Sequence, residues 1–313
     1  MFSFIDRRLP QSLAARKRLG LILLALMCAV WGTTFPILKT LTGSLGALDI
    51  TLLRYGGAGV FLLFMVGGIT RAEWRWGALL GVVLFAAFWL QTEGLARTSS
   101  NRNAFITGLN VLAVPIFAIA LGQRPHWRLW AGCLLAAVGM WFLFYEEAPW
   151  NRGDSLTFIG MIFYAIYILL LEWSARVNRA QPLRIVPLTA LQGVMVGGCA
   201  ALFLLLNGEW TAFVGRAAAL NQAQWLSMAY LLVFASMLAP ALQIWGQRYV
   251  SAVQSAIVYG LEPVFAAIAA YFIIQEGLSP AGLFGAALIV GALLLSQSPS
   301  KKSAEAQLPD DSL

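Results

Sequence analysis

The sequence predicts an all-α integral membrane protein with ten transmembrane helices, arranged as two inverted repeats of five helices. Three observations lead to this prediction: the composition, the number of long apolar runs and an internal repeat. Of 313 residues, 60% are hydrophobic and only 11% are charged, whereas a soluble domain carries about 25% charged residues. Burial increases too slowly with chain length to hide so much apolar surface inside a soluble protein. We therefore expect the surplus to face a lipid bilayer.

Ten apolar runs are long enough to cross a membrane as helices, which takes roughly 20 residues each. They cover residues 20–38, 51–69, 76–96, 104–122, 127–145, 155–173, 185–206, 225–246, 252–274 and 279–297. These runs are too long and too uniformly apolar for the strands of a membrane barrel. The first run follows a basic segment but lacks a clean small-residue cleavage site, so we interpret it as a span and not as a secretory signal.

An internal repeat divides the chain near its middle. A shift of 152 residues places Ala104 on Ala256, Gln123 on Gln275 and Gly139 on Gly291 without a gap. Five spans in each half give the two copies opposite orientations, which is the inverted-repeat plan of many secondary transporters. The expected organisation is a cytoplasmic basic segment (1–19), a first repeat (20–146), an outer connecting loop (147–154), a second repeat (155–297) and a disordered cytoplasmic tail (298–313).

The distribution of positive residues predicts the orientation, because Lys and Arg accumulate in cytoplasmic loops. With both termini inside, the cytoplasmic side holds fifteen of the 21 Lys and Arg residues: Arg7, Arg8, Arg16, Lys17, Arg18, Arg71, Arg75, Arg124, Arg128, Arg176, Arg179, Arg184, Arg248, Lys301 and Lys302. The opposite side holds Lys39, Arg54, Arg97, Arg102, Arg152 and Arg216. The net charge of +7 then follows from the topology and does not indicate nucleic-acid binding.

Several classes of site are excluded by what the sequence lacks. The single histidine, His126, lies in a basic connector, so neither a histidine metal cluster nor a catalytic pair is expected within the spans. Cys28, Cys133 and Cys199 stand alone, without the paired spacing of metal or redox sites. The sequence also lacks a Gly-rich phosphate loop. We therefore expect no catalytic residue, no metal and no cofactor, and a membrane-embedded enzyme is the weaker hypothesis.

Polar and aromatic residues near the centres of several spans are the candidates for a solute site. We select Trp31, Asn110, Tyr164, Gln243 and Tyr259 as a mixed pocket for an amphipathic solute. The alternative for each residue is ordinary packing, because polar side chains also hold membrane helices together.

Glu262, which is followed by Pro263, is the most informative ionisable residue because it lies about halfway along the run 252–274. Ionisable groups at membrane depth are costly and normally face a cavity or a partner. The proline removes a backbone donor and so adds a polar irregularity to the span. We expect Glu262 and Pro263 to act in gating or in coupling to protons. The alternative is a structural carboxylate at a helix junction.

Four further polar residues lie near the outer ends of predicted spans. Gln91 is expected to contribute to an outer gate. Lys39, Arg54 and Glu93 are interpreted as long side chains that snorkel to water.

The order of several motifs resembles the EamA-type members of the drug/metabolite transporter superfamily. The motifs are Trp31-Gly32-Thr33-Thr34-Phe35 with Lys39, Arg54 in the second span, Gly94-Leu95-Ala96-Arg97-Thr98-Ser99 before Ala104, and Glu262-Pro263-Val264-Phe265 with Glu276, Gly285 and Gly291. The resemblance covers about Gly20 to Ser296. It implies ten helices in two inverted repeats around a central cavity, and usually the export of metabolites, amino acids or drugs. One departure is Arg124, where many members have a glutamate, so we do not expect Arg124 to mirror Glu276.

Together these observations predict a secondary transporter of the bacterial inner membrane that exports small organic metabolites, such as amino acids, by alternating access. Its expected partners are a small organic solute and the lipid bilayer. A broad-specificity exporter of drugs or other solutes is the alternative. A passive channel is a weaker one, because the sequence contains neither a charged ring nor a carbonyl filter motif.

The predicted topology can be tested by cysteine labelling from each side of the membrane. We expect both termini and the connector around Arg124 to be labelled from the cytoplasm, and residues 146–154 from the opposite side, because of the uneven distribution of positive charge. Termini on opposite sides would contradict the ten-span arrangement.

Overall fold

The computed structural model describes residues 12–123, 125–144, 149–275 and 279–297. Most of the predicted basic segment, Arg124, the first two residues of the outer connecting loop, Glu276 and the predicted tail lie outside the described residues. Every element of regular structure in the described residues is helical, which confirms the all-α class.

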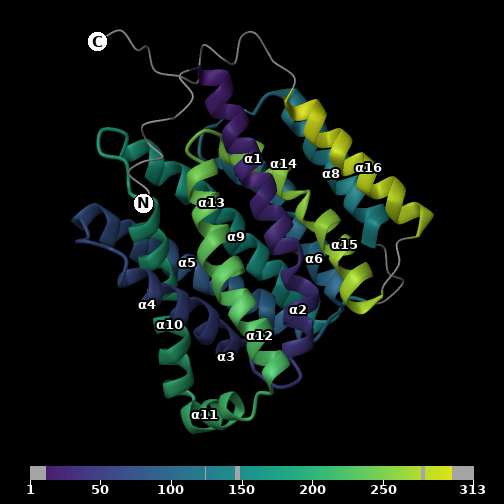
Figure 1. Ribbon diagram of the computed structural model, residues 1–313. Helices are drawn as coiled ribbons and strands as arrows, with labels where there is room; N and C mark the ends of the chain where they lie inside the picture. Colours follow the sequence, from purple (N-terminus) through teal and green to yellow (C-terminus); the bar gives the residue numbers. More distant parts are fainter. Residues whose placement is uncertain (1–11, 124, 145–148, 276–278, 298–313) are drawn as a thin grey trace.

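Figure 1 shows the helices, numbered in chain order. In the first half they are α1 (Leu13–Gly32), α2 (Thr34–Leu41), α3 (Ala47–Thr51), η3 (Leu52–Gly56), α4 (Gly57–Leu63), α5 (Arg71–Leu95), α6 (Ser100–Gly108), α7 (Asn110–Ala120) and α8 (Trp127–Phe144). In the second half they are α9 (Arg152–Val177), α10 (Ile185–Leu206), α11 (Trp210–Ala218), α12 (Gln222–Tyr230), η4 (Leu231–Leu238), α13 (Ala239–Gly246), α14 (Ala252–Tyr259), α15 (Glu262–Ile274) and α16 (Pro280–Gln297). The elements η3 and η4 are π-helical.

Seven helical segments of the described chain are long and apolar enough to cross a membrane. They are Leu13–Leu41, Arg71–Leu95, Arg102–Ala120, Arg152–Val177, Ile185–Leu206, Gln222–Gly246 and Ala252–Ile273, and each coincides with a predicted run. The other predicted spans, 51–69, 127–145 and 279–297, coincide with α3 to α4, with α8 and with α16, which are shorter or interrupted. The count of ten spans therefore stays a prediction.

The two ends of the bundle are distinct (Figure 1). The first turn of α1 and the last turn of α16 lie at the same end, and the short helix α11 lies at the opposite end. Helices α8 and α16 lie side by side along one flank and contact each other extensively. Helix α5 of the first half packs against α9 and α10 of the second half.

Three helices, α3, α5 and α9, each carry an acidic residue in the first turn. This residue takes part in capping the helix and forms an ion pair with an arginine from another segment. Asp49, Glu73 and Asp154 each occupy the third helical position and accept a hydrogen bond from the backbone amide of the N-cap residue. Their ion pairs are Arg216 Nε to Asp49 at 2.6 Å, Arg184 Nε to Glu73 at 2.7 Å and Arg102 Nη2 to Asp154 at 2.9 Å. The hydrogen bonds that Arg184 and Arg216 donate to these carboxylates raise the pKa of both arginines above the ordinary value. These pairs hold distant segments together at the ends of the bundle.

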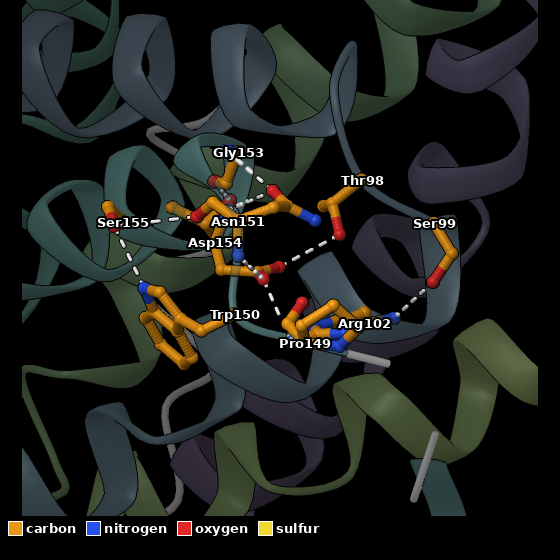
Figure 2. Close-up of polar contacts among 10 residues, drawn as sticks. Thr98, Ser99, Arg102, Pro149, Trp150, Asn151, Gly153, Asp154 and Ser155 are labelled. Atoms are coloured by element: carbon orange, nitrogen blue, oxygen red, sulfur yellow. Dashed lines mark hydrogen bonds and ion pairs between the residues drawn. The ribbon is translucent and has the colours of Figure 1, made fainter. Parts of the chain in front are cut away.

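The Asp154 cluster joins the two halves of the chain (Figure 2). Thr98, which follows α5, donates from its hydroxyl to Asp154 Oδ1 at 2.8 Å. Asn151 caps α9 by accepting from the amides of Gly153 and Asp154. Lys39 donates from Nζ to the carbonyls of Leu95 and Thr98 at 2.8 and 2.7 Å, which adds the end of α2 to the same region.

Close backbone contact between α4 and α10 depends on glycine. A Cβ atom on Gly193 would lie 2.8 Å from Gly59 Cα and 2.9 Å from the Tyr55 carbonyl oxygen. One turn further along, Gly197 meets Gly56 in the same manner. Small residues let membrane helices approach until their backbones touch, which strengthens dispersion contacts where no hydrophobic effect operates.

We predict that Gly193→Ala destabilises the protein, because its new Cβ would collide with backbone atoms that cannot move without separating the helices. Overpacking of this kind costs about 1–3 kcal/mol. The matched control is Gly198→Ala on the same helix, where a Cβ meets nothing within 4 Å. Thermal unfolding in detergent should show a lower midpoint for Gly193→Ala alone; equal midpoints would contradict the close contact.

Candidate functional site

A small cavity lies between helices of the two halves. It is lined by Trp31, Ala87, Phe88, Gln91, Thr107, Gly160, Met161, Tyr164 and Glu262. Four of the predicted site residues are therefore brought together: Trp31 from α1, Gln91 from α5, Tyr164 from α9 and Glu262 from α15.

The apolar wall of the cavity is made of three aromatic rings in mutual contact. The Trp31 ring meets Phe88 and Tyr164 edge-on, with centroids 5.9 Å apart in each pair, and Phe88 lies 6.0 Å from Tyr164. These separations fall within the range in which aromatic pairs attract each other. Trp31 also donates from Nε1 to the Ala235 carbonyl in η4 at 2.8 Å, so its ring has a fixed orientation.

Gln243 and Tyr259 lie one layer behind this wall. Gln243 Nε2 is 3.1 Å from the hydroxyl of Tyr164 and 3.1 Å from the hydroxyl of Tyr259, and both Gln243 and Tyr259 are fully buried. Tyr164 also stacks on Tyr167, which donates to Gln192 at 2.8 Å. These contacts set the position of Tyr164, the one member of the network that reaches the cavity.

Asn110 and Pro263 are not among the lining residues. Asn110 begins α7, is 1% exposed, and its Oδ1 atom has no hydrogen-bond partner in the described part of the chain. Pro263 is the second residue of α15, where a missing amide hydrogen costs no helical hydrogen bond. Its ring lies against Gly108, the last residue of α6.

Three interrupted helices meet around the cavity. Helices α1 and α2 are separated at Thr33, α6 and α7 at Leu109, and α14 and α15 at Gly260 and Leu261. Helix α15 packs on α1 and α6 close to these interruptions, where Gly32 faces the Glu262 carbonyl and Gly108 faces Pro263. Discontinuous helices of this kind commonly form the solute sites of transporters.

Glu262 is the acidic member of the site. It is the first residue of α15 and is 7% exposed. Within the described part of the chain, none of the ion pairs includes Glu262, whereas the other described acidic residues are paired with arginines. The helix dipole stabilises a negatively charged carboxylate near a helix N-terminus. This stabilisation is smaller than that from a paired cation or from water.

Polar contacts surround Gln91, which lines the cavity. Gln91 Nε2 donates to the Thr107 hydroxyl at 3.0 Å, and Asn103 Nδ2 donates to the Gln91 carbonyl at 3.1 Å. Asn103 also donates to Thr157, a residue of α9, at 2.7 Å. Gln91 is thus part of a set of hydrogen bonds that joins α5, α6 and α9.

The structure contradicts the interpretation of Arg54 as a snorkelling residue. Arg54 lies midway between Ala47 and Leu63 and is 3% exposed. Its guanidinium carbon lies 4.6 Å from the centroid of the Tyr55 ring and 5.2 Å from that of Phe88. Such ring contacts contribute about 0.5–2 kcal/mol, whereas an arginine at the centre of a membrane helix costs at least about 2.5–3.5 kcal/mol. The ring contacts offset part of this cost, and none of the ion pairs among the described residues includes Arg54.

Glu93 and Lys39 have different surroundings from Arg54. Glu93 forms an ion pair with Arg97 at 2.5 Å and both side chains are partly exposed, in agreement with the expected contact with water. Lys39 instead donates to the carbonyls of Leu95, the last residue of α5, and of Thr98.

Sequence reasoning missed Phe88, Thr107 and Met161 as lining residues. Helical spacing was the signal that could have found two of them. Phe88 precedes Gln91 by three residues, and Met161 precedes Tyr164 by three residues, so each pair shares one helix face. The described residues contain no group of three side chains that could hold a metal ion, and Cys28, Cys133 and Cys199 are free thiols.

Comparison with known proteins identifies a matching sequence family and a shared fold. The sequence model described as the EamA-like transporter family matches residues 18–145 and again residues 151–297. An uncharacterized transporter of Archaeoglobus fulgidus is 28% identical over 273 residues, covering 87% of this chain and 83% of that protein. A second uncharacterized transporter of the same organism is 24% identical over 288 residues, covering 89% and 96%. A solved crystal structure superposes with a TM-score of 0.67 at 16% identity, covering 91% of this chain and 98% of that one, which shows a shared fold.

Proposed function

Because the chain belongs to the EamA-like transporter family, we propose that it is a secondary carrier that exports small organic metabolites, such as amino acids, across the bacterial inner membrane by alternating access. The observation that carries this proposal is the cavity between the two halves. Trp31 and Phe88 come from the first half, Tyr164 and Glu262 come from the second, and all line the same space. Movement of one half against the other would change the access to such a site.

Two observations support the proposed pair of inverted five-helix repeats. The family model matches the chain twice, once in each half. The start of α1 and the end of α16 lie at one end of the bundle, as an even number of crossings requires (Figure 1). We place both termini in the cytoplasm on the distribution of Lys and Arg.

A carrier fits the cavity better than a channel does. Trp31 and Tyr164 are each 5% exposed and Glu262 is 7% exposed, so the walls are largely shielded from bulk water. A channel would instead need a continuous polar path. A broad-specificity exporter of drugs or other solutes is the second candidate, because an aromatic wall with few polar groups can accept many apolar bodies.

The experiment that tests the proposal is counterflow in proteoliposomes loaded with a panel of unlabelled amino acids and related metabolites. A carrier accelerates the entry of a labelled solute when the same solute is present inside, whereas a pore does not. Flux without this trans-stimulation would contradict a carrier.

Two adjacent aromatic residues of α5 provide a matched test of the cavity wall. Phe88 lines the cavity, whereas Trp89 packs on Phe85 and Phe203 away from it. We predict that Phe88→Leu raises the half-saturation concentration for the transported solute about three- to tenfold, since ring contacts contribute about 0.5–1.5 kcal/mol. Trp89→Leu should leave it unchanged. Equal effects of the two substitutions, after correction for the amount of folded protein, would contradict the assignment.

A second prediction separates coupling from structure at Glu262. The substitution Glu262→Gln keeps the shape of the side chain and removes its titration. If Glu262 carries the coupling proton, as we propose, this variant exchanges solute at equal pH but does not accumulate it under a pH gradient. Glu172→Gln is the control, because Glu172 is equally buried but pairs with Arg176 at the end of α9. Wild-type accumulation in Glu262→Gln would assign Glu262 to the helix junction.

A further inference from the structure

Arg54 carries a charge that the described residues do not neutralise. It is 3% exposed, its Nε–H has no hydrogen-bond partner among the described residues, and none of the ion pairs there includes it. The other described acidic residues bind Arg97, Arg102, Arg176, Arg184 and Arg216. The one described carboxyl group left for a cation is Glu262, and it is not paired with Arg54.

The nearest groups to Arg54 are poor acceptors for its donors. The Tyr55 hydroxyl lies 3.4 Å from Nη2, which is at the limit of a hydrogen bond. The Tyr55 and Phe88 rings stack at 5.0 Å and lie beside the guanidinium group. An arginine offers five N–H donors in a planar fork that matches a carboxylate. Most of that capacity is unused here.

A buried hydroxyl lies on η4, the element that packs against the segment containing Arg54. Ser236 is 2% exposed, and its hydroxyl lies near that of Tyr55 without a hydrogen bond of normal geometry. Arg54 belongs to η3 and Ser236 to η4, and these two π-helical segments contact each other. π-Helical segments occur frequently at functional sites. A π-helical segment from each half of the chain therefore places a buried polar side chain, Arg54 or Ser236, in the same region.

We infer that Arg54 is the anion-binding subsite of the solute cavity and that the transported solutes carry a carboxylate group. Phe88 connects the two places, because its ring lines the cavity and also lies 5.2 Å from the Arg54 guanidinium carbon. The apolar body of the solute would lie against Trp31 and Tyr164, and its carboxylate would reach Arg54 past the edge of Phe88. The inference rests on the proposed transport function and names the chemical class of its substrate.

Glu262 is a candidate partner for a positively charged group of the same solute. It lines the cavity without an ion pair, so a solute with both an ammonium and a carboxylate group could satisfy Glu262 and Arg54 together. Such a zwitterion would supply the two counter-charges that the described residues do not provide. An anion without an ammonium group would satisfy Arg54 alone.

The test measures ligand-induced thermal stabilisation of the purified full-length protein, with three probes that share a phenyl body. L-Phenylalanine carries both charges, 3-phenylpropanoate carries the carboxylate alone, and phenethylamine carries the ammonium alone. We expect 3-phenylpropanoate to stabilise the wild type, and Arg54→Met to weaken its binding roughly tenfold or more, because a charged hydrogen-bonding partner is lost. Phenethylamine binding should not change in Arg54→Met.

A comparison without ligand provides an independent readout. If Arg54 is kept for binding, Arg54→Met leaves the thermal midpoint unchanged or raises it, whereas the control Arg216→Met lowers it by breaking the ion pair with Asp49. If Arg54→Met does not fold, Arg54→Lys keeps the charge but not the planar fork, and it should bind 3-phenylpropanoate several-fold more weakly.

The inference is overturned if 3-phenylpropanoate does not stabilise the wild type, or if it binds the Arg54 variants as tightly as the wild type. Binding is measured without transport, so these outcomes are separate from a failure of the proposed function. That failure would appear as an absence of counterflow while carboxylate binding still depends on Arg54.

Discussion

Lipid offers no hydrogen bonds to a peptide group, so a helix can be interrupted at membrane depth only where the protein itself replaces the lost bonds. The described residues meet this requirement around the cavity. The Thr33 hydroxyl donates to the Val30 carbonyl at 2.7 Å, and the Thr34 hydroxyl donates to the Trp31 carbonyl at 2.6 Å. The Trp31 indole in turn donates to Ala235, in a π-helical segment whose carbonyls are displaced from the α-helical pattern. The cavity therefore lies where side chains supply hydrogen bonds to backbone carbonyls near the helix interruptions.

The same constraint explains how charges are distributed. Asp49, Glu73 and Asp154 lie at helix starts, where each binds the backbone amide of its N-cap residue and an arginine. Each of these carboxylates loses its water but gains several donors, so its burial is compensated within the protein. Glu262 and Arg54 lie within interrupted helices and lack such partners among the described residues. Paired charges fix the ends of the bundle, and unpaired charges mark the region that a ligand or water must complete.

Much of the fold followed from the sequence because apolar length is a strong signal. The segments that the composition made obvious, such as 185–206 and 252–274, coincide with helices of the structure. The interruption of 51–69 by a π-helix did not follow, because π-helical segments depend on packing against neighbours and have no sequence marker comparable to proline. Trp31, Tyr164 and Glu262 could be selected because polar or amphipathic residues are conspicuous in an apolar run. Phe88 was harder to select, because nineteen phenylalanines are spread along the chain and only its spacing of three residues from Gln91 places it on the helix face of a candidate residue.

Arg54 shows why position along a span does not determine depth or environment. Its place near the start of an apolar run suggested a side chain that reaches water, but the helix begins at Ala47 and so carries Arg54 further inside. Gly59 and Gly193 bring α4 and α10 into backbone contact further along the same segment. A buried charge without an acidic partner among the described residues is retained at a cost to stability. The cost is consistent with a positive charge kept for binding, and the glycine contacts fix the segment that carries it against the other half of the chain.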